Sequence, residues 1–453
     1  MRFTAPNPPP QALDPASPIL QSDRELHARI AEPVRAPCRI RHSAYLLPDE
    51  EEDTRAQVRE GFEEVLHRLE IVQRAITWGE RSGRVEVALP GGATLRIVWE
   101  LHTQFYSYTT FHFPPDGEAA PPDDPARVPA FAFPHMPVLG TKLVDLDLVV
   151  LPGRELTDAM RAFIGPEPIY GGIVLAGEGR VWTTFRVNAQ GQARYVVGAG
   201  ELPPGRLGRL VRRVVEIENY CHMILLPLEE YREQVEALRR LEQRITQRSS
   251  DIAAELGRRE PDPGAEHRWL VYLTRDLAEL MQLSERMRHK LSAASSYYAI
   301  FEERLRWLRE QTGDGFQSME EFLTARIAPV HRNYRNFMER AEALTSQITV
   351  LGNMLRTRVN LSMEAQNLET MRSMKTRVEL QLKLQRAVEG LSVVVITYYL
   401  TGLSNWGFKA LEEFLPLPGG PILWSAGSVP VWFLLSFWVF HRVQAMLKRE
   451  DHD

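Results

Sequence analysis

The residue types best suited to chemistry gather near position 100, in the run Trp99-Glu100-Leu101-His102-Thr103-Gln104. In a strand, alternate side chains share a face, so Glu100 and His102 would lie side by side. A carboxylate beside an imidazole can share a proton or hold a cation. A solvated, hydrogen-bonded sheet face explains the same pattern, and we expect that structural role rather than catalysis.

A second run of the same kind, Glu25-Leu26-His27-Ala28-Arg29, also favours a structural role. The sequence contains no GxGxxG, P-loop, HExxH or GxSxG motif. Its two cysteines, Cys38 and Cys221, form neither a CxxC pair nor a ligand spacing for zinc. We therefore expect no enzyme: no catalytic residue, no cofactor and no metal site. The net charge of -5 gives no electrostatic reason for a nucleic-acid partner.

Two stretches near the C-terminus, residues 390–408 and 414–440, carry no charged side chain. A helix needs about 20 predominantly apolar residues to cross a bilayer, so both stretches qualify as transmembrane helices. Basic side chains flank them, with Arg377, Lys383 and Arg386 before the first and Arg442, Lys448 and Arg449 after the second. The positive-inside rule then predicts an inner-membrane protein with both termini in the cytoplasm. Pro430 indicates that the second helix either bends there or begins there.

The first apolar stretch contains a small polar cluster, Gly402, Ser404, Asn405 and Gly407. Small residues allow helices to pack closely, and an amide in hydrocarbon needs a partner. This face is expected to meet protein, either at a helix interface, which we favour, or at the mouth of a pore.

The elements that would position these groups fall into successive segments. We expect a disordered Pro-rich arm (1–21), an α/β or α+β cytoplasmic domain (22–205), long stalk helices (206–388), a two-span hairpin (389–441) and a cytoplasmic tail (442–453). In the domain, apolar spacing predicts a helix over 54–78, a strand hairpin over 84–100, and strands near 103–113, 143–151, 169–175, 181–187 and 193–197. A helix is expected over 155–163.

In the stalk, Pro227 must bend or divide a helical pattern over 207–249, and further patterns cover 267–311 and 316 onward. Leu344, Ile348, Leu351 and Leu355 keep coiled-coil spacing, and Val378 and Leu382 resume it nearer the membrane. This spacing predicts self-association through the seam. The alternative is a set of helices folded over one another.

Four motifs in order resemble one bacterial membrane-anchored family: RELHAR (24–29), APCRIRHSAYLL (36–47), VWELHTQFYSYT (98–109) and TRVELQLKLQRAVEGLSVVVITYYLTGL (376–403). The family is domain of unknown function 3422. The resemblance implies a membrane anchor and no established activity, and it leaves the motif residues Glu25, His27, Arg29, Trp99, Glu100 and His102 without a role. The predicted architecture is also similar to that of CorA-type magnesium channels, but Gly402-Leu403-Ser404-Asn405 replaces their Gly-Met-Asn signature.

These observations lead to one preferred function and one alternative. The preferred function is a membrane-anchored, cytoplasm-facing assembly or scaffold, with the lipid bilayer and further copies of itself as partners. The alternative is a CorA-like channel or transporter for a divalent cation.

Overall fold

The protein is described here from a computed structural model. It describes residues 17, 31–48, 52–71, 76–115, 123–131, 138–166, 168–258, 264–311, 313, 315–413, 415 and 418–450. The chain divides into two compact units, one of Met1–Glu260 with Val271–Val350 and the other of Pro261–Leu270 with Leu351–Asp453. The predicted arm (1–21) therefore lies outside the described residues, except for Ser17.

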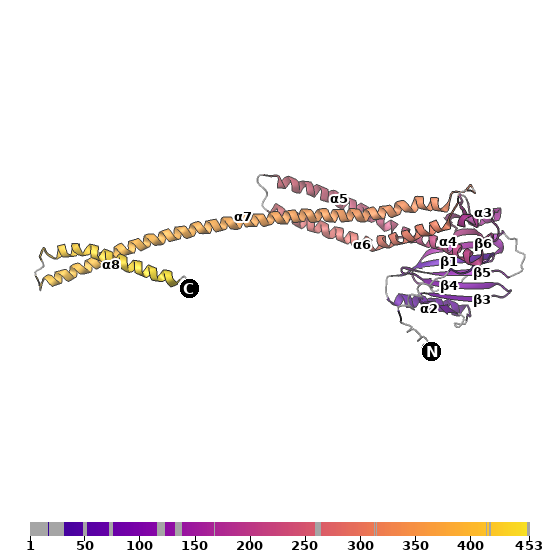
Figure 1. Cartoon of the computed structure of the whole chain (residues 1–453), viewed down its shortest axis with the longest axis horizontal. Helices are drawn as coiled ribbons and strands as arrows, with labels where there is room; N and C mark the ends of the chain where they lie inside the picture. The colour runs from indigo at the N-terminus through magenta and orange to yellow at the C-terminus, as the bar shows by residue number, and fades with distance from the viewer. Residues whose placement is uncertain are drawn as a thin grey trace, which may run out of the picture. The chain divides into compact units, whose positions relative to one another are not determined.

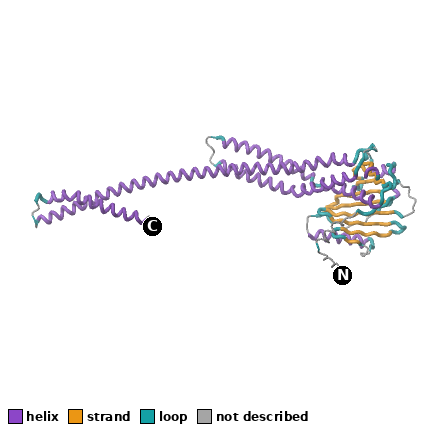
Figure 2. The backbone as a smooth tube through the Cα atoms, in the orientation of Figure 1, coloured by secondary structure: helices purple, strands orange, loops and turns teal. Residues whose placement is uncertain are grey.

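The first unit is built on one sheet, whose strands are orange in Figure 2. The sheet has nine strands in the order β2-β3-β4-β5-β1-β6-β9-β8-β7. Its strands are β1 (Cys38–Leu46), β2 (Thr77–Trp78), β3 (Ser82–Ala88), β4 (Thr94–Leu101), β5 (Phe105–Phe113), β6 (Thr141–Leu151), β7 (Tyr170–Val174), β8 (Gly179–Val187) and β9 (Ala193–Gly198). Neighbouring strands are antiparallel except β6 and β9, which are parallel. A mostly antiparallel sheet of this kind decides between the two predicted classes in favour of α+β.

Helices cover both faces of the sheet (Figure 1). On one face, Val58, Phe62 and Leu66 of α2 (Glu52–Arg68) pack into a buried cluster with Ile97 and Trp99 of β4. On the other face lies α4 (Pro204–Leu225), which buries twelve of its residues. Every residue of β5 is buried, as expected for a central strand covered on both sides. The predicted domain boundary at residue 205 thus separates the sheet from a helix that covers it.

Most predicted strands lie close to observed ones, but the helix predicted over 54–78 is wrong at its end. α2 stops at Arg68, because Glu70 adopts a left-handed φ of 56° and the Ile71 N–H bonds back to the Leu66 carbonyl. That pairing is a helix-ending Schellman motif. The apolar spacing continued past the true end because Leu69, Ile71 and Ile76 pack onto the same core after the helix has ended. The central strand β1 was not predicted.

The remaining helices are α3 (Asp158–Ile164), α5 (Leu228–Leu256), α6 (Ala265–Leu308), α7 (Met319–Glu412) and α8 (Pro421–Glu450). As one of the two alternatives predicted, Pro227 divides α4 from α5 rather than bending one helix. α8 begins at Pro421 and contains Pro430, so a second helix that begins at Pro430 is excluded.

Within the first unit, α7 packs against α5. The Tyr231 and Tyr334 rings lie 5.1 Å apart, and Arg340 forms a bidentate ion pair with Glu242. Leu344 and Ile348 are buried in this packing. Leu355, in the second unit, is buried as well, and Leu351 is partly buried. The expectation of a seam open to another copy is therefore wrong at Leu344, Ile348 and Leu355, because these side chains are already buried within the chain.

In the second unit, α7 and α8 each contain a segment long and apolar enough to cross a membrane. Only 11% of the first segment and 6% of the second is buried. Val393 and Thr397 of α7 and Ser436 of α8 are buried where the helices meet, while Leu403 and Trp406 are more than half exposed. The apolar surface of this hairpin thus faces outward.

Candidate functional site

The motif residues of the N-terminus, Glu25, His27 and Arg29, lie outside the described residues. Trp99 and Glu100 lie on opposite faces of β4. Trp99 is buried against α2, with its ring stacked 5.8 Å from that of Phe62. Glu100, the next residue of the motif, therefore lies on the face of the sheet that does not contact α2.

Glu100 points toward α4, where its carboxylate accepts a 3.1 Å bond from Arg212. Burial lowers the pKa of Arg212, but the carboxylates of Glu100 and Glu216 outweigh it, so the net shift is upward. The strand ends at Leu101, and His102 lies in the turn that follows, with its ring stacked 4.2 Å from that of Phe105. Glu100 thus pairs with a guanidinium from α4 rather than with the imidazole of His102.

The polar cluster of the first apolar stretch faces α8 at one position. Trp432 Nε1 donates a 2.7 Å hydrogen bond to Ser404 Oγ. The Asn405 amide oxygen is buried and has no hydrogen-bond partner among the described residues. A side chain at Gly402 or Gly407 would meet no described atom within 4 Å, so neither glycine permits a close contact inside the chain. A second-copy contact or a pore for this face stays a prediction.

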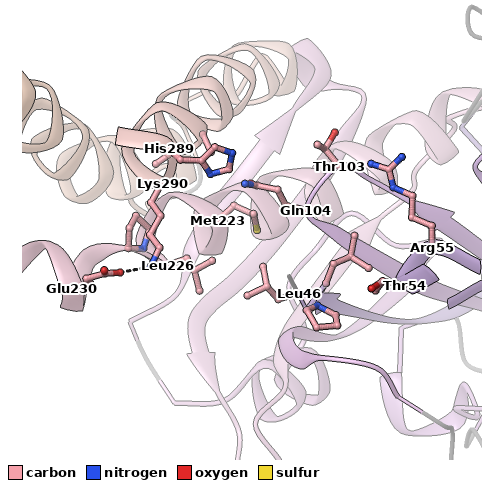
Figure 3. Close-up of a pocket in the computed structure, with 15 residues that line it drawn as sticks. Leu46, Thr54, Arg55, Thr103, Gln104, Met223, Leu226, Glu230, His289 and Lys290 are labelled. Carbon is pink, nitrogen blue, oxygen red and sulfur yellow. Dashed lines mark hydrogen bonds and ion pairs between the residues drawn. The ribbon is translucent and has the colours of Figure 1, made fainter. Parts of the chain in front are cut away.

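The main cavity of the first unit lies where the ends of the central strands β1, β4 and β5 meet α2, α4, α5 and α6 (Figure 3). Its volume is about 640 Å³. The residues that line it come from four parts of the chain: Leu46, Leu47, Pro48, Thr54, Arg55, Thr103, Gln104, Met223, Leu226, Pro227, Glu230, His289, Lys290, Ala293 and Ala294.

Local breaks in regular structure create this cavity. Pro227 ends α4 and leaves Leu226 half exposed, because proline cannot continue the helical hydrogen-bond ladder. Opposite it, the tight β4–β5 turn presents Thr103 and Gln104, held by a hydrogen bond from the His102 N–H to the Phe105 carbonyl. Sequence reasoning missed the cavity, and the helix break at Pro227 was its one visible signal.

Polar side chains line part of the cavity wall. Lys290 and Glu230 form an ion pair on one side of it, and the Arg55 and His289 side chains also line the wall (Figure 3). Among the described lining residues Glu230 is the sole carboxylate, and no cysteine or serine is present. The cavity thus combines polar side chains with apolar walls such as Met223.

A buried polar network lies behind the cavity, between the sheet and α4. His42 Nδ1 lies 2.8 Å from Thr109 Oγ1, and its Nε2 lies 3.0 Å from Asn219 Oδ1. Because the Asn219 oxygen can only accept, Nε2 carries the proton and Nδ1 accepts from the threonine hydroxyl. Burial lowers the pKa of His42 to about 4, so this histidine is neutral at physiological pH. Its role is structural.

No metal site is evident among the described residues, since no three His, Cys, Asp or Glu side chains gather as ligands. In comparisons with known proteins, no curated protein matches the chain, and no solved structure matches it either. The similarity to CorA-type channels therefore gains no support. One family profile matches residues 21–447, nearly the whole chain. The chain belongs to the family described as protein of unknown function (DUF3422).

Proposed function

We propose that this protein is a non-enzymatic membrane anchor that holds its first unit at the cytoplasmic face of the inner membrane and assembles with further copies of itself. The observation that carries the proposal is the outward apolar surface of α7 and α8. Side chains such as Leu403, Ile422 and Leu434 are at least 65% exposed, which is costly in water and favourable in lipid.

Charge supports a hairpin with both ends in the cytoplasm. Arg377, Lys383 and Arg386 precede the apolar segment of α7, and Arg442 follows that of α8. The link between the helices carries Lys409 against Glu412 and Glu413. An excess of basic side chains on one side retains that side in the cytoplasm.

Self-association is supported by a different part of α7 from the seam of Leu344. Over residues 361–388 every residue is exposed. Leu361, Leu368, Met371, Val378 and Leu382 recur there at steps of seven, three, seven and four. This is the spacing of a coiled-coil seam. Copies anchored in one membrane share orientation and depth, so their seams would align in register at high effective concentration.

Cysteine labelling in intact cells tests the anchor. The native cysteines give a low background, because Cys38 is buried and Cys221 is partly buried. We expect a membrane-impermeant maleimide to label Glu412→Cys from outside, and Asp453→Cys only after the inner membrane is permeabilised. Recovery of the native chain in the soluble fraction, or the opposite labelling pattern, would refute the proposal.

A further inference from the structure

A pocket lined by arginines lies away from the main cavity, in the first unit. Leu175, Arg206, Arg209, Arg213, Trp307 and Arg309 line it, and its volume is about 390 Å³. The arginines at 206, 209 and 213 are three and four residues apart, so they share one face of α4. Arg309 joins them from the end of α6, across the pocket.

The charge of this pocket is not balanced within the described part of the chain. Arg206 is paired with Glu178. No described residue pairs with the side chains of Arg209 or Arg309, and both residues are exposed. Arg213 Nη1 donates to the Trp307 carbonyl, and its guanidinium lies 5.5 Å from the centre of the indole. Four arginines thus line one pocket, and no carboxylate is among its described lining residues.

The pKa of Arg213 reflects the same imbalance. Burial lowers it, and the neighbouring guanidinium groups of Arg209, Arg304 and Arg309 lower it further, against the opposing effect of Glu216. Like charges held together in this way cost free energy, which an anion placed among them would recover.

The backbone around the pocket is strained. Leu175, Ala176 and Arg309 have φ values of 52°, 57° and 46°, a left-handed conformation that favours glycine. The Ala176 N–H bonds to the Arg309 carbonyl, which joins the two strained segments. Arg309 follows the last residue of α6, a position where glycine is the usual choice. An arginine at this position has a strained backbone and places a guanidinium in the pocket. Such strained residues cluster at functional sites.

We propose that this pocket binds a compound with two or more phosphate groups, held by bidentate contacts to Arg209 and Arg309. Guanidinium groups match the geometry of phosphate oxygens, and several together discriminate multiple charges from a single one. The site is independent of the proposed anchor function. The phosphate groups could belong to a soluble compound or to a lipid headgroup, and the test separates these sources.

The test titrates the full chain in neutral detergent with inorganic pyrophosphate and with ADP, and separately with cardiolipin-containing micelles. Heat of binding and tryptophan fluorescence are the readouts, and Trp307→Phe identifies the signal of the pocket among the nine tryptophans. Saturable binding of pyrophosphate or ADP assigns a soluble source, and binding of cardiolipin alone assigns a lipid headgroup. No saturable binding in any arm overturns the proposal.

Three substitutions sharpen it. Arg209→Ala and Arg309→Gly should each weaken binding at least tenfold. Arg309→Gly should keep the native melting midpoint or raise it, because glycine adopts the left-handed backbone without strain. The matched control is Arg306→Ala, which removes an exposed arginine of α6 outside this pocket. It should change affinity less than twofold. If all three substitutions weakened binding equally, the ligand would be attracted by general surface charge, and the proposed site would be wrong.

Discussion

At the scale of single residues, the described polar groups of the sheet stabilise the fold. Asp147 of β6 is almost fully buried, and its carboxylate accepts two hydrogen bonds from Arg39, at 2.9 and 2.8 Å. It also forms a 2.8 Å ion pair with Arg41. Two cations from the neighbouring strand β1 thus depend on one anion. A buried charge that loses its partner is costly, so this carboxylate is a sensitive point of the sheet.

Asp147→Asn should therefore lower the free energy of unfolding by about 3 kcal/mol, because two guanidinium groups lose their counter-charge. Thermal and urea unfolding of the full chain in detergent would measure it. Asp145→Asn is the matched control in the same strand, since Asp145 pairs with the half-exposed Lys142. We expect its cost to stay below about 1 kcal/mol. Similar losses for both variants would contradict the argument.

His42 gives the fold a defined sensitivity to acid. Burial lowers its pKa to about 4, whereas an unfolded histidine titrates near 6.5, so the unfolded chain binds the extra proton between these values. The contribution of His42 to the free energy of unfolding is therefore fully present above pH 6.5. It is lost as the pH falls toward 4, which lowers the free energy of unfolding by about 3 kcal/mol.

Unfolding of the native chain and of His42→Asn between pH 7 and 4 checks this expectation. The variant should be less stable at pH 7 but should lose less stability on acidification. A native slope in the His42 variant would show that other groups cause the acid loss.

At the scale of elements, α7 contains two apolar seams that differ in their exposure to solvent. The seam of Leu344 and Ile348 is buried inside the first unit, whereas the seam that includes Leu368 and Leu382 is exposed in the second. Equal spacing in the sequence thus leads to intramolecular packing in one case and to an open surface in the other.

The exposed seam should hold copies together. Each leucine that becomes buried in a complex contributes about 1.5 to 3 kcal/mol, so Leu368→Asp with Leu382→Asp should convert the native complex to monomers. Leu380→Asp with Leu384→Asp is the matched control, because both leucines are exposed but lie off the seam. Light scattering on the detergent complex gives the mass. A monomeric native chain, or equal dissociation of both double variants, would count against self-association.

At the scale of the whole molecule, the first unit contains the sheet, its covering helices and the described cavities other than the one beside Trp432. The second contains the apolar hairpin. This division predicts that the first unit can be separated from the apolar hairpin.

A fragment that ends at Val350 should therefore be soluble and melt cooperatively. A fragment that ends at Gly205 should aggregate, because it loses α4 and exposes the buried sheet face beneath Leu210, Val214 and Ile217. Circular dichroism and gel filtration of both fragments distinguish these outcomes. A soluble, cooperatively folded shorter fragment would show that α4 is dispensable and that the predicted boundary at 205 is a true one.

The sequence by itself determined the features that depend on local pattern. Uncharged length predicted two helices able to cross a membrane, and alternation with turn residues predicted the β3–β4 hairpin. Pro227 predicted that the helical pattern bends or divides, and the structure shows the division. These signals are local because hydrogen-bond geometry and apolar periodicity act over a few residues.

Only the tertiary structure decided which groups meet. Glu100 pairs with Arg212 more than a hundred residues away, and Arg309 completes a pocket begun by Arg209. α2 ends at Arg68 although its apolar spacing continues, because the following residues pack onto the same core. Such contacts depend on how segments far apart in the sequence pack together. The local pattern of a single sequence does not show which of these segments will meet.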